Sequence, residues 1–216
     1  AYIPKAKNLS KLYAVTCGLT RGPYIRQIPG SGDVSTDLFT SKSDAQAYCS
    51  DSENSSLSLS AAEYAKSAIP GLYRNLYTYG LNSIDIHDED NIYHIYLYEI
   101  AKRKKPASNA PSNVNNIENP GLQKDMLLFM QELRAKKENP DKEYRMQLDR
   151  NMGMSMKNAR YLMPYNELNI GGKRSVGLVM LTNNVNKDKV IPLFTDKYEF
   201  DRFRAGKPFK LLIMDY

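Results

Sequence analysis

Residues 106–116, near the middle of the chain, are too polar and too rich in proline to belong to a folded core. They read Pro-Ala-Ser-Asn-Ala-Pro-Ser-Asn-Val-Asn-Asn, with one apolar residue larger than alanine. Such a stretch buries too little apolar surface to offset the entropy lost on ordering. We therefore predict a linker over residues 106–117 between two domains, residues 1–105 and 118–216, and expect proteases to cut the chain at the linker first.

Composition and charge exclude several classes of protein. The chain has 216 residues, of which 42% are hydrophobic, so it is long enough for two domains and is not globally disordered. No apolar run reaches the roughly 18 residues of a membrane span, so we expect none. Residues 1–105 carry 12 basic and 11 acidic side chains, whereas residues 106–216 carry 18 and 13. The basic residues of the second half are dispersed, so we expect no nucleic-acid partner, although weak association with nucleic acid through that half stays open as an alternative.

A short sequence repeat suggests that the two halves are related. Leu-Phe-Thr at residues 38–40 recurs at residues 193–195, and each copy precedes a short helical pattern. Threonine at the end of a strand is a suitable helix N-cap. Two copies predict an internal duplication, in which Phe39 and Phe194 occupy equivalent buried positions.

Hydrophobic periodicity and turn residues predict an α+β fold in which small mixed or antiparallel sheets are flanked by helices. The predicted strands cover residues 11–17, 24–28, 35–39, 83–87, 92–100, 159–163, 176–182, 190–194 and 209–214. The predicted helices cover residues 41–49, 61–69, 71–79, 122–133, 143–151 and 197–204.

Three segments of the second half resemble the N-terminal domain of the SseB family, which is named for enhanced serine sensitivity. They are Glu-Asn-Pro-Gly-Leu at 118–122, Ala-Arg-Tyr-Leu-Met-Pro at 159–164 and Ile-Pro-Leu-Phe-Thr-Asp at 191–196. The resemblance implies two tandem SseB-like domains, the first diverged and the second truncated at its C-terminal end. It also implies a bacterial, cytoplasmic protein, and it supplies no catalytic residues.

The richest supply of metal ligands surrounds one predicted hairpin. His87 and His94 flank an acidic turn that contains Asp88 and Asp90, and imidazole and carboxylate are ligands of zinc. Residues 88–91 are equally typical of a tight turn. We expect no metal or other cofactor here, with polar side chains facing solvent, including Asp85. A metal-dependent or hydrolytic enzyme that uses this hairpin stays an alternative.

Tyrosines offer a second kind of site. Five of them gather in one region of the sequence: Tyr73, Tyr77, Tyr93, Tyr96 and Tyr98. Tyrosine combines apolar area with a polar tip, which suits a binding surface and equally suits the edge of a sheet. No sequence pattern pairs a nucleophile with a base, and Cys17 and Cys49 are typical of structural thiols. We therefore predict no catalytic residues and a non-enzymatic adaptor that binds a protein partner.

Overall fold

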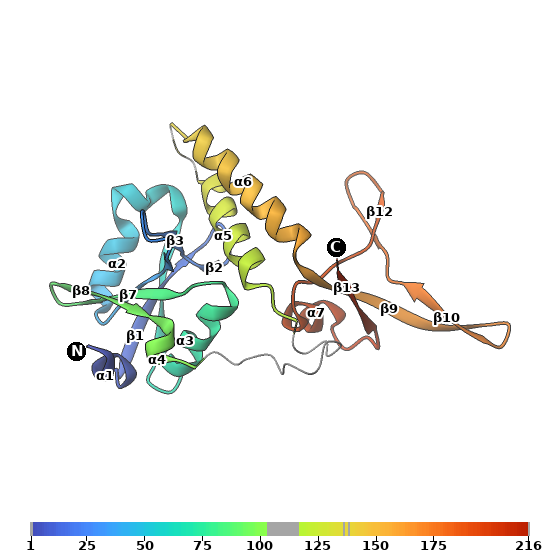
Figure 1. Cartoon of the computed structure of the whole chain (residues 1–216), viewed down its shortest axis with the longest axis horizontal. Coiled ribbons are helices and arrows are strands. Elements are labelled where there is room, and N and C mark those ends of the chain that lie inside the picture. Colours follow the sequence, from blue (N-terminus) through green and yellow to red (C-terminus); the bar gives the residue numbers. More distant parts are fainter. Residues whose placement is uncertain (1, 103–116, 136, 138, 216) are drawn as a thin grey trace. The chain divides into compact units, whose positions relative to one another are not determined.

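The computed structural model describes residues 2–102, 117–135, 137 and 139–215 (Figure 1). Residues 106–116 of the predicted linker over 106–117 lie outside these residues, and Ile117 is buried. The chain forms two compact units. Unit 1 comprises residues 1–104 and 120–155, and unit 2 comprises residues 105–119 and 156–216. The fold is α+β, as predicted.

A mixed sheet forms the centre of unit 1. Its strands are β1 (Lys11–Cys17), β2 (Gly22–Pro23), β5 (Asp37–Phe39), β6 (Leu59–Ala65), β7 (Ser83–Asp88) and β8 (Asn91–Tyr96). The order is β6-β1-β5-β7-β8, with β2 also beside β1. The β5–β7 pair is parallel and the other pairs are antiparallel. A separate small hairpin joins β3 (Arg26–Gln27) to β4 (Val34–Ser35).

Helices cover both faces of this sheet. They are α1 (Ile3–Lys7), α2 (Lys42–Ser50), the 3-10 helix η1 (Ser52–Leu57), α3 (Ile69–Thr78), α4 (Leu97–Ile100), α5 (Pro120–Arg134) and α6 (Lys142–Lys157). Side chains alternate between the two faces of a strand. In β1, Leu12 and Ala14 join the main core with α3 and α5, whereas Tyr13 and Val15 join a smaller core with α2.

Helix α5 belongs to unit 1, although the sequence analysis assigned residues 118–216 to a second domain. The buried Gln131 side chain accepts a hydrogen bond from the Ile25 N–H at 3.1 Å and donates one to the Ile25 carbonyl at 2.7 Å. Leu127 and Leu128 enter the main core beside α3 residues. These long-range contacts, which no local pattern reveals, group residues 120–155 with the first half.

Two predicted elements of unit 1 are wrong. Residues 61–69 were expected to be helical, yet β6 pairs with β1 over the full seven residues of both strands. Pairing with a neighbouring strand outweighs the helix propensity of its alanines. The strand expected to reach residue 100 ends at Tyr96, where α4 begins and the Glu99 carboxylate accepts a hydrogen bond from the Tyr96 N–H at 3.1 Å.

Unit 2 contains the antiparallel sheet β10-β9-β13, formed by β9 (Arg160–Ile170), β10 (Lys173–Leu178) and β13 (Lys210–Asp215). A short pair, β11 (Leu181–Thr182) with β12 (Lys189–Val190), and one helix, α7 (Lys197–Arg204), complete the unit. Leu162 and Phe200 are fully buried, and Phe194 packs against Phe200 with ring centroids 5.7 Å apart.

The two Leu-Phe-Thr segments share a local arrangement. Phe39 lies in β5, antiparallel to β1, and Phe194 forms an antiparallel bridge with Leu162 of β9. Phe39 is buried and Phe194 half-buried. The predicted threonine caps are wrong by one residue, because Ser41 and Asp196 accept the capping hydrogen bonds of α2 and α7. The duplication itself stays a prediction.

Within the described residues, none of the helices has the length and the apolar content that crossing a bilayer requires.

Candidate functional site

Two buried carboxylates lie side by side on the face of the sheet that α2 covers. Asp37 of β5 and Asp85 of β7 are neighbours in the parallel register and are 1% and 4% exposed. Asp85 was predicted to face solvent, and this prediction is wrong. The alternation with Ile84 and Ile86 is real, but the opposite face is also covered, so Asp85 is buried among polar partners.

Arg26, from the β3–β4 hairpin, neutralises this pair. Its Nε donates to Asp37 Oδ2 at 2.9 Å and its Nη2 donates to Asp37 Oδ1 at 3.1 Å. The same Nη2 also donates to Asp85. A guanidinium that bridges two carboxylates is the geometry in which arginine stabilises buried negative charge best.

Both histidines bind these carboxylates, each to a different one. His87 Nε2 lies 2.8 Å from Asp37 Oδ1, and His94 Nδ1 lies 2.6 Å from Asp85 Oδ1. In the hairpin register His94 faces Asp85, so the two histidines are not directly opposite each other. The His87 ring also stacks on Phe39, with centroids 4.2 Å apart.

Hydroxyl groups complete the cluster. Tyr48 of α2 donates to Asp37 Oδ2 at 3.0 Å, and the buried Ser35 donates to Asp85 Oδ2 at 3.0 Å. Burial alone raises the pKa of Asp37, but hydrogen bonds from His87 and Arg26 and the charge of Arg26 hold that pKa below its usual range. Burial, followed by the nearby charge of Asp37, raises the pKa of Tyr48, which keeps the phenol protonated.

The acidic turn does not join this cluster. Asp88 accepts hydrogen bonds from Lys5 and, at 2.9 Å, from the Thr40 hydroxyl. The bond from Lys5 is the largest cause that lowers the pKa of Asp88. Asp90 is exposed at the tip of the turn. Within the part of the chain that the structure describes, no three His, Cys, Asp or Glu side chains are placed to hold a metal ion.

The chemistry of the cluster is that of a satisfied charge network. Each carboxylate has at least three donors or possible donors, counting the two imidazole rings. No serine, threonine or cysteine side chain among the described residues hydrogen-bonds either imidazole, so no nucleophile–base pair is present there. Removing one charge from such a network leaves its partners buried and unpaired.

The five predicted surface tyrosines lie in different environments. Tyr73 is in the main core, where its hydroxyl donates to a backbone carbonyl at 3.1 Å, and Tyr77 donates to another at 3.2 Å. Tyr93 is half-buried and packs against the main core. Tyr96 and the exposed Tyr98 stack with ring centroids 5.5 Å apart. The structure therefore groups Tyr73, Tyr77 and Tyr93 in or against the main core, and Tyr96 with Tyr98 in a separate stack.

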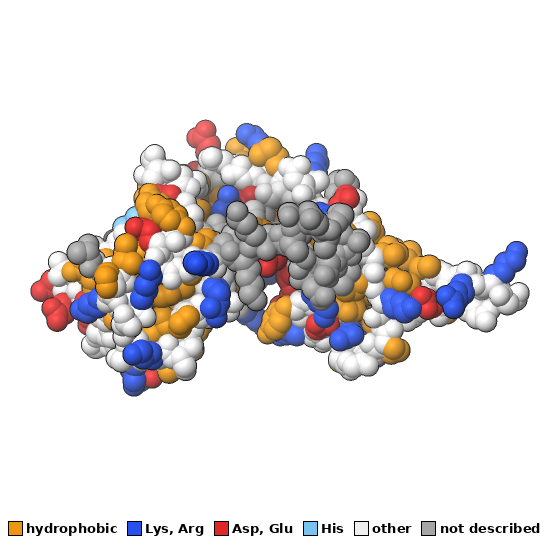
Figure 2. Space-filling view, turned by 60° about the horizontal axis from the view of Figure 1, so that its bottom comes forward, with side chains coloured by type: hydrophobic (Ala, Val, Ile, Leu, Met, Phe, Trp, Pro, Cys, Tyr) orange, Lys and Arg blue, Asp and Glu red, His pale blue; other side chains and the backbone are white. Residues whose placement is uncertain are grey.

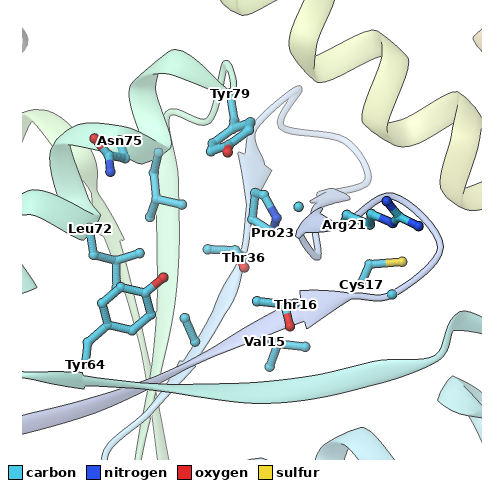
Figure 3. A pocket seen from close by; sticks show the side chains of 14 residues that line it. Val15, Thr16, Cys17, Arg21, Pro23, Thr36, Tyr64, Leu72, Asn75 and Tyr79 are labelled. Carbon is cyan, nitrogen blue, oxygen red and sulfur yellow. The ribbon is translucent and has the colours of Figure 1, made fainter. Parts of the chain in front are cut away.

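A pocket that the sequence analysis missed lies on the other face of the sheet, beneath α3 (Figure 3). Its volume is about 370 Å³. On this face of β1, Ala14 and Thr16 are both smaller than Leu12, which leaves room between the strand and α3. Leu72 and Tyr79 line the opposite side. The two small side chains were the available sequence signal, but small residues indicate a pocket only when the position of α3 is known.

Thr36 is the unusual residue of this pocket. It is 1% exposed, and its hydroxyl has no hydrogen-bond partner in the described ranges. An unsatisfied buried hydroxyl costs about 1–3 kcal/mol. By contrast, the hydroxyl of Thr16 in the same lining bonds to the backbone and side chain of Ser60 at 3.1 and 2.8 Å.

Unit 2 exposes apolar side chains on a long hairpin. Figure 1 shows β9 and β10 as a long two-stranded hairpin. Its apolar side chains are exposed on both faces: Leu168 and Ile170 on one, Val176 and Leu178 on the other. Basic side chains accompany them along the hairpin, as Figure 2 shows in blue. Exposed apolar groups gathered in this way are typical of an interaction site.

The comparisons with known proteins name no family. No protein-family model matches the chain, and no curated protein matches it. Among solved structures, Anabaena Tic22 (protein transport) aligns with 99% of this chain and 80% of its own, at 14% identity and a TM-score of 0.26. At that TM-score the similarity carries no argument about this chain.

Proposed function

We propose that this chain is a non-enzymatic binding module that takes up an extended segment of a partner protein along the outer edge of β10. The exposed apolar side chains on the β9–β10 hairpin carry the proposal. The SseB-like ancestry and the cytoplasmic location expected from the sequence resemblance are parts of the same proposal.

The backbone of β10 offers hydrogen-bonding groups to an added strand. The Val179 N–H donates to the Pro164 carbonyl at 3.3 Å, which fixes the residues of β10 that face β9. Along an antiparallel strand, the backbone N–H and C=O groups of successive residues point alternately toward the partner strand and away from it. Ser175 and Gly177 therefore bond to β9, whereas the N–H of Val176 points away from it. In the described part of the chain, β10 pairs with β9 alone. Strand addition to such an edge is a common mode of peptide binding.

The side chains along β10 define what would bind. Val176 and Leu178 share one face with Arg174 and are 56% and 39% exposed, and Lys173 lies on the other face. Residues 156–216 contain 11 basic and 6 acidic side chains. An added strand with apolar side chains on one face and acidic side chains on the other would match both features.

In this proposal the polar cluster of unit 1 has a structural role. Asp37, Asp85, His87 and His94 all bond to one another or to Arg26. Such a network stabilises one arrangement of β5, β7 and β8, which is a structural role.

A designed peptide tests the proposal. The probe is a fluorescein-labelled peptide that alternates valine and glutamate and matches β10 in length, and its anisotropy is measured against the full chain. We expect binding that weakens with salt, and at least tenfold weaker binding of a valine–lysine peptide.

Two substitutions at one position give matched variants. Val176→Pro removes the outward N–H and leaves the bonds to β9 in place, so it should abolish binding. Val176→Thr keeps that N–H and should bind within about threefold of the parent. Absence of peptide binding to the parent chain, or equal binding by both variants, would contradict the proposal. Sedimentation that shows pairing of two copies through β10 would replace the peptide with a second chain as the partner.

A further inference from the structure

The pocket beneath α3 combines a confined volume with a polar group for which the described residues supply no hydrogen-bond partner. Its volume of about 370 Å³ lies at the small end of the range for ligand pockets, about 300–1,000 Å³. Figure 3 shows Thr36 among the side chains that line it. The Thr36 hydroxyl is buried and has no partner in the part of the chain described here. Because buried polar groups are nearly always hydrogen-bonded, this hydroxyl suggests a missing ligand atom.

A cation also lines the pocket. Arg21 lies in the turn between β1 and β2 and lines the pocket. It is exposed, and no carboxylate among the described residues forms an ion pair with it. A guanidinium in that position suits a carboxylate, which it can bind through two parallel hydrogen bonds.

Helix α5 holds this turn in place. Arg134 donates to the Leu19 carbonyl at 2.5 Å, and Gln131 bonds to both backbone groups of Ile25. These contacts lie on either side of Arg21 in sequence, so the wall that carries Arg21 is fixed at both ends. A fixed wall reduces the ordering that a ligand must impose.

The rest of the lining is largely apolar. Leu72 and Leu76 of α3 and Tyr64 of β6 form much of it. The apolar part of a ligand bound here would be removed from water, and this burial favours binding in small-molecule sites.

We infer that this pocket binds a small amphipathic carboxylic acid, with its acid group at Arg21, its apolar body against Leu72 and Tyr64, and a polar atom bonded to Thr36. The inference concerns unit 1 and is independent of peptide binding at β10.

Three related compounds separate the two polar contacts. The parent probe is para-hydroxyphenylpropionate. Phenylpropionate lacks the inner hydroxyl, and para-hydroxyphenylpropionamide lacks the charge. We expect the full chain to bind the parent probe about fivefold more tightly than phenylpropionate and about tenfold more tightly than the amide, as measured by ligand-detected NMR titration.

Each contact has its own variant. Thr36→Val should remove the preference for the inner hydroxyl and keep the preference for the acid. Arg21→Gln should do the reverse. Arg74→Gln, at an exposed position on α3 outside the lining, is the control and should leave all three affinities unchanged. Amide spectra of the variants establish that each is folded.

Several outcomes would overturn the inference. They are failure of the full chain to bind any of the three compounds, equal affinities for all three, and preferences that survive in both pocket variants. The first would mean that water alone fills the pocket and satisfies Thr36.

Discussion

Replacing Arg26 with methionine should destabilise unit 1 more than the same replacement of any other partly exposed lysine or arginine. Arg26 makes three hydrogen bonds to Asp37 and Asp85, whose side chains are 2% and 6% exposed. Methionine keeps much of the apolar stem and removes the charge, so both carboxylates lose their guanidinium.

The magnitude follows from the burial of the carboxylates. Breaking a buried ion pair by removing one partner costs about 3–5 kcal/mol. Arg26 is itself 35% exposed, and Asp37 keeps its bonds to Tyr48 and His87, which reduces the loss. We expect a decrease of about 2–3 kcal/mol in the free energy of unfolding near neutral pH.

The pH dependence provides a second signature. The folded-state pKa of Asp37 lies below its usual value, so its stabilisation is complete above the unfolded pKa of about 3.9. That stabilisation is lost as pH falls through the lower folded pKa. In Arg26→Met, the guanidinium no longer opposes the effect of burial on the pKa of Asp37, and the hydrogen bond from His87 still lowers it. The difference between parent and variant should therefore be largest near neutral pH and shrink on acidification.

Urea unfolding followed by circular dichroism measures both effects. Arg74→Met is the matched control, because Arg74 is exposed on α3 and should change stability by less than about 0.5 kcal/mol. If Arg26→Met loses less than about 1 kcal/mol, or loses the same amount at every pH, Arg26 does not hold the two carboxylates as described.

Two further substitutions test packing in unit 1. Thr36→Val should raise the free energy of unfolding by about 1 kcal/mol, because it replaces an unpartnered buried hydroxyl, whereas Thr16→Val should lower it by about 1 kcal/mol through loss of the bonds to Ser60. Urea titration compares the pair, and a loss of stability in both variants would mean that the Thr36 hydroxyl has a partner. Gly80→Ala should cost about 3 kcal/mol, because Gly80 has a φ of +78° and an added Cβ would lie 2.2 Å from the Pro120 carbonyl oxygen. A melting temperature equal to that of the parent would contradict that contact.

Local pattern predicted much of the fold. The strand over residues 11–17 was predicted with its observed bounds, and the helix predicted over residues 71–79 corresponds to α3. The incorrect predictions concern segments whose structure depends on contacts with residues far away in the sequence. Residues 61–65 are helix-prone alone but complete a sheet beside β1, and α5 joins unit 1 through Gln131.

The candidate sites were harder to predict, for the same reason. His87 and His94 were recognised as a pair, but Asp37, which bonds to His87, and Arg26, which bonds to both carboxylates, come from strands far away in the sequence. Asp85 was placed on the correct strand and assigned the wrong environment, because alternation separates two faces without showing which face is covered. The pocket depends on where α3 crosses β1, which no residue pattern encodes locally.

The most direct test of the proposed function is amide hydrogen exchange along β10, measured by NMR with and without the valine–glutamate peptide. The account predicts that the outward amides of Val176 and Leu178 exchange more slowly when the peptide is bound. The amides of Ser175 and Gly177, which already bond to β9, should change little. Unchanged exchange at Val176 and Leu178 with saturating peptide would contradict strand addition at this edge.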